Sequence, residues 1–128
     1  MKRSIRISGL DSLEVWDFAT VNNITYAGTY AYGIFKSLDD DLTWSASNEG
    51  LRTESEYVTV TSITAVDAKT ILCSTLGKGL FISKDSGSSW HGYNGGITDE
   101  NLWTSFYDHK SKIIFSASPS GIYKNKFR

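Results

Sequence analysis

One stretch of the chain occurs twice, 46 positions apart, and this repeat limits the possible folds more than any other feature. Residues 28–44 (GTYAYGIFKSLDDDLTW) recur as residues 74–90 (STLGKGLFISKDSGSSW), and the match continues through residues 48–51 and 94–97. A third copy begins near Leu102, and its Gly121 and Tyr123 match Gly79 and Phe81. Repeats of this length are typical of arrays in which each copy is one structural unit.

The third copy is divided between the two ends of the chain. It stops after its third segment, and the segment that it lacks corresponds to residues 3–8, because residues 8–10 align with residues 49–51 and 95–97. Each unit consists of short segments rich in β-branched and aromatic residues, separated by Gly, Asn, Asp and Ser, which predicts four strands per unit. We label these strands A to D. The first unit has them at 15–20, 24–29, 33–37 and 43–48, and the second at 58–66, 70–75, 79–83 and 89–93.

The segment between strands C and D carries a recurring turn motif. Its clearest copy is Ser83-x-Asp85-x-Gly87-x-Ser89-Trp90, and Ser37-x-Asp39-x-Asp41-x-Thr43-Trp44 differs only by Asp41 at the glycine position. A carboxylate at the start of a tight turn can accept hydrogen bonds from backbone amides, and Gly or Asp tolerates the left-handed conformation. We therefore expect these residues to stabilise the hairpin, with the Trp closing strand D onto its sheet.

The motif, the preceding Gly-x-[Phe/Tyr] strand and the following Asn-x-Gly-[Leu/Ile] segment resemble the blades of Asp-box (BNR) β-propellers, such as those of sialidases, sortilin-type receptors and xyloglucanases. The resemblance implies an all-β fold of three four-stranded blades, at about 14–48, 58–93 and 102–127. In such families the Asp box is a structural turn, and one fold serves many functions. The resemblance therefore predicts the fold rather than an activity.

Three blades are too few for a closed ring, because propellers have about four to eight. We expect two copies to form a six-bladed homodimer in which residues 3–8 of each chain complete the third blade of the partner by strand addition. The alternative is that the sequence is a fragment of a longer propeller.

Composition excludes several other classes of protein. The net charge of −1 leaves no basic surface suited to nucleic acid. No apolar run is long enough for a membrane span and no signal peptide is evident, so a cytoplasmic location is the default expectation. The single Cys73 lies in an apolar run and is expected to be buried, and no metal site or cofactor motif is present.

The connections between strands B and C and between D and the next A are expected to share one face, where propeller ligands usually bind by family resemblance. Aromatic rings there would stack on a sugar or anchor a peptide, and charged groups would orient it. No catalytic residue is assigned, so we expect a non-enzymatic module that binds a glycan, peptide or protein. The alternative is a glycoside hydrolase-like enzyme, which needs two carboxylates about 5–9.5 Å apart. The candidate ligand-binding residues are Trp16, Tyr30, Tyr32, Arg52, Tyr57 and Trp103, with Glu14, Asp99 and Glu100 as acceptors.

Overall fold

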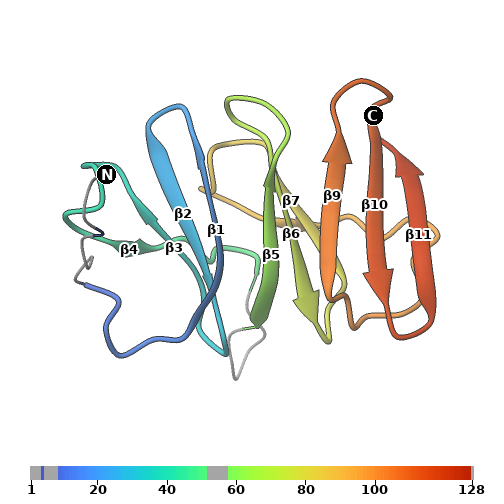
Figure 1. Ribbon diagram of the computed structural model, residues 1–128, viewed down its shortest axis with the longest axis horizontal. Coiled ribbons are helices and arrows are strands. Elements are labelled where there is room, and N and C mark those ends of the chain that lie inside the picture. The colour runs from blue at the N-terminus through green and yellow to red at the C-terminus, as the bar shows by residue number, and fades with distance from the viewer. Residues whose placement is uncertain (1–3, 5–8, 52–57, 128) are drawn as a thin grey trace.

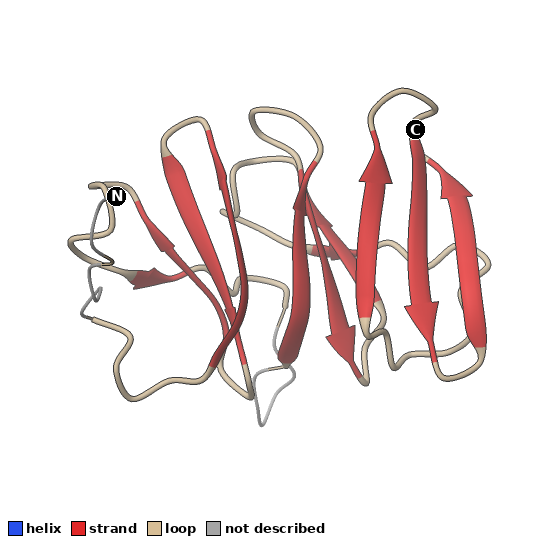
Figure 2. Cartoon of the chain, viewed as in Figure 1, coloured by secondary structure: helices blue, strands red, loops and turns tan. Residues whose placement is uncertain are grey.

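The computed structural model describes residues 4, 9–51 and 58–127, and every regular element in this part is a β-strand (Figures 1 and 2). The strands form three antiparallel sheets that stand side by side in chain order. Sheet 1 contains β1 (Val15–Val21), β2 (Ile24–Thr29), β3 (Gly33–Ser37) and β4 (Ser45–Ala46). Sheet 2 contains β5 (Thr59–Ala65), β6 (Ile71–Leu76), β7 (Leu80–Ser83) and β8 (His91–Gly92). Sheet 3 contains β9 (Thr104–Asp108), β10 (Ile113–Ser118) and β11 (Gly121–Lys126).

The expected all-β fold is confirmed, and strands B and C of the first unit begin and end at the predicted residues. Strand D is shorter than predicted in both complete sheets, with two residues in β4 and two in β8. Sheet 3 has three strands within the described residues. The segment expected to complete it, residues 3–8, lies outside the described part of the chain except for Ser4.

Two apolar cores hold neighbouring sheets together. The first joins Tyr26 and Ile34 of sheet 1 to a set of sheet 2 residues: Val60, Ile63, Ile71, Cys73 and Trp90. The second joins Leu72, Leu80 and Ile82 of sheet 2 to Leu102, Tyr107 and Ile114 of sheet 3. Sheet 2 therefore has a front face, which packs on sheet 1, and a back face, which packs on sheet 3, and we use the same two names for the equivalent faces of sheets 1 and 3. Cys73 is fully buried as expected, and burial raises the pKa of its thiol.

The A strands β1, β5 and β9 lie next to one another and are joined by a repeated hydrogen bond. The amide of Ile63 donates to Asp17 Oδ2 at 2.9 Å, and the amide of Ser105 donates to Ser62 Oγ at 2.9 Å. Asp17 and Ser62 occupy the same position, because each follows the β-bulge of its strand. A polar side chain at this position thus links each A strand to the next.

The C–D hairpins share one hydrogen-bond pattern. In sheet 2, Asp85 Oδ1 accepts from the Ser89 amide at 2.9 Å, and Asp85 Oδ2 accepts from the Ser89 hydroxyl at 2.6 Å. The hydroxyl of Ser83 donates to Asp85 at 2.8 Å and accepts from the amide of Gly87 at 2.8 Å. The middle of the turn is therefore held by a serine hydroxyl, a role that the sequence had suggested for the carboxylate alone.

The hairpin of sheet 1 repeats this geometry with different residues. Asp39 accepts from the amide and hydroxyl of Thr43, and the amide of Asp41 donates to Ser37 Oγ at 2.9 Å. Asp41 has a φ of 71° and Gly87 has a φ of 82°, so aspartate adopts the left-handed conformation that glycine adopts in the second copy. Hydrogen bonds, chiefly those from Thr43 and from Ser89, lower the pKa of Asp39 and of Asp85 to about 2.

Trp90 shares a core with residues of its own sheet and with residues of the preceding sheet, and the link to the preceding sheet was not predicted from the sequence. Its ring is buried in the core between sheets 1 and 2, and its indole Nε1 donates to the carbonyl of Ser47 in sheet 1 at 2.8 Å. The amide of Trp90 also donates to the carbonyl of Glu49 at 2.8 Å. The Trp of the motif therefore fastens one sheet to the preceding sheet.

We expect Asp85→Ala to lower the free energy of unfolding by about 1 kcal/mol, near the lower end of the ~1–3 kcal/mol that an unsatisfied buried donor costs. The hydrogen bonds between Asp85 and Ser89 are exposed, so water replaces part of what the carboxylate supplies. Urea unfolding followed by circular dichroism measures the change, with the exposed neighbour Lys84→Ala as the control. Equal stability of the two variants would show that the carboxylate does not stabilise the hairpin.

Candidate functional site

The B–C loops and the D–A connections lie on one face of the structure, at the lower end of the sheets in Figure 1. This follows from the strand pairing, because each A strand begins where its neighbouring B strand ends, as in the pairs Val15–Thr29 and Thr59–Leu76. We call this surface the loop face. Within the described residues it comprises 9–14, 30–32, 48–51, 77–78, 94–103 and 119–120.

An aromatic pair lies at the edge of the loop face on sheet 1. The ring centroids of Trp16 and Tyr30 are 5.5 Å apart with an interplanar angle of 39°, and both side chains are exposed. Tyr32, two residues along the same loop, is also exposed. Three of the predicted ligand-binding residues therefore lie close together, although 14 positions separate Trp16 from Tyr30.

The loop that carries these tyrosines is fixed by backbone hydrogen bonds. The amide of Tyr30 donates to the carbonyl of Glu14 at 2.9 Å, and the amide of Ala31 donates to Thr59 Oγ1 of sheet 2 at 2.8 Å. The amide of Gly33 donates to the carbonyl of Val58 at 3.0 Å. Both tyrosines are thus presented on a braced loop, which lowers the entropic cost of binding a ligand.

Trp103 occupies in sheet 3 the position that Trp16 occupies in sheet 1. Trp16 lies in the β-bulge at the start of strand A, and Thr61 lies in the corresponding bulge of sheet 2. Trp103 directly precedes β9, its amide donates to the carbonyl of Ala117 at 2.8 Å, and its side chain is exposed. Trp16 and Trp103 therefore place two exposed indole rings at the same end of the row formed by the A strands β1, β5 and β9.

Asp99 has a structural role within the loop face. Its Oδ2 accepts from the hydroxyl of Ser120 at 2.7 Å, and its Oδ1 accepts from the amide of Asn101 at 2.9 Å. These two hydrogen bonds, that of Ser120 first, lower the pKa of the Asp99 carboxyl. The carboxylate thus ties the connection before β9 to the loop between β10 and β11.

The other predicted acceptors differ from Asp99. Glu14 and Glu100 are exposed, and it is their backbone carbonyls that hold neighbouring loops: Glu14 accepts from Tyr30, and Glu100 accepts from Gly77 and Gly79. Arg52 and Tyr57, also predicted for this site, lie outside the described residues. No group of three or more His, Cys, Asp or Glu side chains suited to a metal ion occurs within residues 9–51 and 58–127. No helix in the same ranges could span a membrane.

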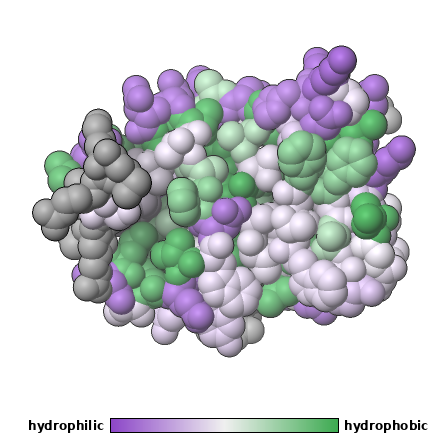
Figure 3. Space-filling model, viewed as in Figure 1, coloured by the Kyte–Doolittle hydropathy of each residue, from purple (hydrophilic) through white to green (hydrophobic). Residues whose placement is uncertain are grey.

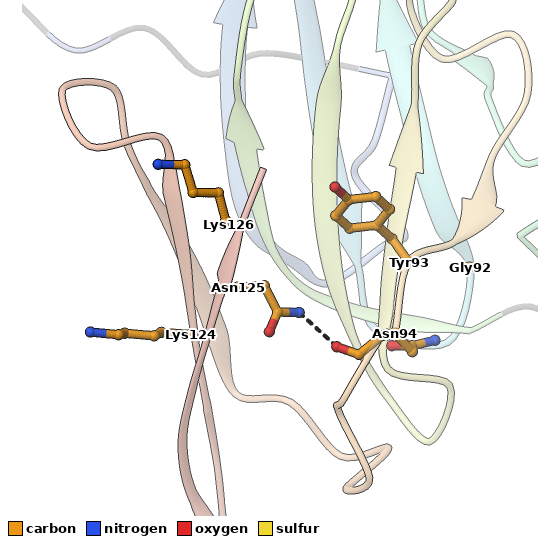
Figure 4. A pocket seen from close by; sticks show the side chains of 7 residues that line it. Gly92, Tyr93, Asn94, Lys124, Asn125 and Lys126 are labelled. Atoms are coloured by element: carbon orange, nitrogen blue, oxygen red, sulfur yellow. Dashed lines mark hydrogen bonds between the residues drawn. The ribbon is translucent and has the colours of Figure 1, made fainter. Parts of the chain in front are cut away.

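Two grooves extend beyond the loop face, which contributes only Leu10, Asn94 and Gly95 to their lining, and sequence reasoning did not predict them. One has a volume of about 540 Å³ and lies between residues 92–95, in and just after β8, and Lys124, Asn125 and Lys126 of β11 (Figure 4). In it the Asn125 side-chain amide donates to the carbonyl of Gly95 at 3.1 Å, as the dashed line shows. The second, of about 300 Å³, is apolar and lies on the front face of sheet 1, lined by Leu10, Val15, Phe18, Thr20, Thr25, Ala27, Asp41 and Trp44.

The groove beside β11 has a smaller counterpart between sheets 1 and 2. That counterpart has a volume of about 370 Å³ and is lined by residues 46–49 together with Lys36, Gly87 and Ser88. Gly87 and Ser88 belong to the C–D hairpin of sheet 2, and the hydroxyl of Ser47 donates to the carbonyl of Gly87 at 2.6 Å. Residues 102–128 of the third unit contain no Asp-box motif, and this difference between the repeats is the sequence signal that could have located the larger groove.

Comparison with known proteins shows the fold. No protein-family model and no curated protein sequence matches the chain. Among solved structures, it is similar to PorZ of Porphyromonas gingivalis, a bacterial surface component of the type-IX secretion system (TM-score 0.69, 17% identity). It is also similar to an ancestral GH74 enzyme (0.64, 22%) and to YCF48 from Cyanidioschyzon merolae (0.66, 12%).

The alignments cover 88%, 88% and 89% of this chain, but only 17%, 17% and 34% of PorZ, the GH74 enzyme and YCF48. The chain therefore spans between about a sixth and a third of the length of these proteins. All three are β-propeller proteins. At these identities the likeness concerns the fold alone, so the three sheets of this chain correspond to propeller blades.

Proposed function

We propose that the chain is a non-enzymatic binding module that presents its loop face to a glycan, a peptide or a protein. The observation that carries the proposal is the exposed Trp16–Tyr30 pair on a loop braced by Glu14 and Thr59. Exposed aromatic rings on a rigid loop offer a large contact area at low entropic cost, which suits stacking on a sugar or capture of an apolar peptide side chain. Trp103 on sheet 3 extends the aromatic surface.

We further propose that two chains assemble this module as a six-bladed propeller with Asp-box turns. Residues 3–8 of each chain would form strand D of the partner's sheet 3. The groove beside β11, between sheets 2 and 3, supports this proposal. It occupies the position that is equivalent to the site between sheets 1 and 2 where the C–D hairpin of sheet 2 packs. In sheets 1 and 2, strand D pairs Ala46 with Phe35 and Gly92 with Phe81. By the repeat alignment, Ile5 would then pair with Tyr123 and Ser4 with Lys124 in the proposed strand exchange.

The alternative function is that of a glycoside hydrolase-like enzyme, and the similarity to GH74 structures is what favours it. A glycosidase needs one carboxyl group to donate a proton and a second to act as nucleophile or base. Asp99 is already engaged by Ser120 and Asn101, which leaves Glu14 and Glu100, on different sheets, as the described carboxylates of the predicted set. Release of reducing sugar from xyloglucan by the purified protein would favour the enzyme over the binding module.

We expect a screen of glycans and peptides to identify ligands of the loop face. The affinity for these ligands should fall at least about tenfold in Trp16→Ala and in a Tyr32→Ala/Arg52→Ala variant, which is equivalent to a loss of ~1.4 kcal/mol in binding free energy. Isothermal titration calorimetry measures this change and the stoichiometry. A ligand on a two-fold axis binds once per two chains, and one on each loop face binds once per chain. The control is His91→Ala, an exposed ring on β8. Ligands that bind all variants equally would place the site elsewhere.

A further inference from the structure

We propose that the front face of sheet 1 is covered by the back face of sheet 3 from a second copy of this chain, in the register seen between the sheets of one chain. Phe106 and Phe115 would enter the apolar groove lined by Phe18, Ala27 and Trp44, and Thr104 would accept a hydrogen bond from the amide of Phe18. The inference rests on the proposed dimer and specifies which surfaces meet and how they are aligned.

The front face of sheet 1 carries the residues that form a buried core in sheet 2. By strand position, Val15, Phe18, Thr25, Ala27 and Trp44 correspond to Val60, Ile63, Ile71, Cys73 and Trp90. All five residues of sheet 2 belong to the core against sheet 1. Their counterparts include exposed apolar side chains: Ile63 is 6% exposed, whereas Phe18 is 68% exposed. The front face of sheet 1 is thus an apolar packing surface that lies open.

The back face of sheet 3 is the matching half of such a junction. By strand position, Phe106, Phe115 and Ile122 correspond to Thr64, Leu72 and Leu80, of which the two leucines are buried against sheet 3. Leu80 is 0% exposed, but Ile122 is 79% exposed. The centroids of Phe106 and Phe115 lie 6.4 Å apart, and apolar side chains gather over β9–β11 at the right of Figure 3. Sheet 3 therefore exposes an apolar back face, whereas sheet 1 exposes an apolar front face.

Side-chain sizes on the two open faces are partly complementary. In the first junction Ala19 and Tyr26 occupy the back-face positions opposite a front face containing Ile71 and Cys73. In the open pair the back face is larger at Phe106, which replaces Ala19, and the front face is smaller at Thr25 and Ala27 but larger at Phe18, which replaces Ile63. Close packing requires that a gain in volume on one face be matched by a loss on the other. The smaller Thr25 and Ala27 thus leave part of the room that the larger Phe106 would need.

A buried donor also indicates that sheet 1 accepts a preceding sheet. Trp90 Nε1 donates to the carbonyl of Ser47 in strand D of the preceding sheet. The equivalent atom, Trp44 Nε1, is buried and has no hydrogen-bond partner in the described part of the chain. An unsatisfied buried donor is costly, so it favours a partner that brings a carbonyl to this position. In the proposed exchange, strand D of the partner's sheet 3 would hold this position, and residues 3–8 of this chain would form that strand.

The hydrogen bonds between A strands fix the alignment of the proposed interface. The Asp17 side chain accepts from the Ile63 amide, and Ser62 accepts from the Ser105 amide. Thr104 occupies the same position in sheet 3, and Phe18 corresponds to Ile63 and Ser105. The amide of Phe18 would therefore donate to the Thr104 hydroxyl of the other copy. A two-fold axis makes this contact twice and covers both open faces of both chains.

The test is a disulfide between copies. The hydroxyls of Ser62 and Ser105 are 3.2 Å apart across the second junction, so cysteines at the equivalent positions would be close enough to bond. We expect the Phe18→Cys/Thr104→Cys variant to form a covalent dimer on mild oxidation, seen on a non-reducing gel. Each single variant, and Thr104→Cys combined with Leu38→Cys on a distant turn, should stay uncrosslinked. The native Cys73 is buried and does not compete.

A second variant tests the same interface if the double-cysteine variant fails to fold. Ile122→Lys places a charge on the open face and should give a folded monomer by circular dichroism and light scattering, while Leu38→Lys should leave the mass unchanged. A ladder of covalent species larger than a dimer would overturn the proposed closed dimer, because it would show that the two faces join chains end to end. An uncrosslinked double-cysteine protein with the mass of a dimer would overturn the register and leave the proposed dimer standing. A monomeric wild-type protein would overturn both the register and the proposed dimer. None of these three results decides whether the loop face binds a ligand.

Discussion

Trp90→Ala is expected to lower the free energy of unfolding by about 3–5 kcal/mol, the cost of removing a large buried aromatic side chain. The ring is 1% exposed and lies in the core that joins sheets 1 and 2. Its removal also leaves the carbonyl of Ser47 without the indole donor. Urea unfolding at a fixed protein concentration measures the loss, which is large enough to unfold a domain of ordinary stability.

Trp44→Ala is the matched control, because Trp44 holds the same motif position in sheet 1. Its ring is partly exposed, and its Nε1 makes no hydrogen bond within the described residues. In the monomeric Ile122→Lys background, where the front face of sheet 1 is uncovered, we expect Trp44→Ala to destabilise the fold less than Trp90→Ala. Equal losses of the two variants in that background would mean that the junction between sheets 1 and 2 is not what makes Trp90 important.

Deleting residues 1–8 is expected to weaken self-association at least about 100-fold, equivalent to ~2.7 kcal/mol. The proposed strand exchange gives each chain a strand D along the edge of the partner's β11, and the deletion removes all of its backbone hydrogen bonds. Sedimentation velocity over a range of protein concentrations measures the change. A control that keeps the length but replaces residues 3–8 by Gly and Ser separates the effect of side chains from that of the strand itself. An unchanged association constant would contradict the exchange.

The fold was largely predictable because its signals are local and repeated. Short segments rich in β-branched and aromatic residues, bounded by Gly, Asn, Asp and Ser, located β2 and β3 at their observed residues, and the repeat located their counterparts in sheet 2. The role of Trp90 was not predictable, because its partner Ser47 belongs to another sheet, 43 positions away. The serine hydroxyls in the hairpins were missed for a related reason. Which of two nearby polar groups accepts a given amide depends on turn geometry that composition does not specify.

The candidate site was predictable only in part. The sequence placed Trp16, Tyr30 and Tyr32 on one face from the order of strands, but the contact between Trp16 and Tyr30 depends on the β-bulge that turns Trp16 out of the regular alternation. Asp99 was expected to accept from a ligand, and the structure shows both of its oxygens accepting from Ser120 and Asn101. A loop carboxylate that binds its own chain cannot be told from one that binds a ligand by sequence alone.

The most direct test of the central claim is the molar mass of the wild-type protein in solution, measured by light scattering after size-exclusion chromatography. The chain has a mass of 14.2 kDa. Two open apolar faces of opposite kind on one chain predict a species of twice that mass, stable on dilution to low micromolar concentration. A stable monomer of 14.2 kDa would contradict the two-chain propeller, and a species of three times the chain mass would replace it with a nine-bladed ring.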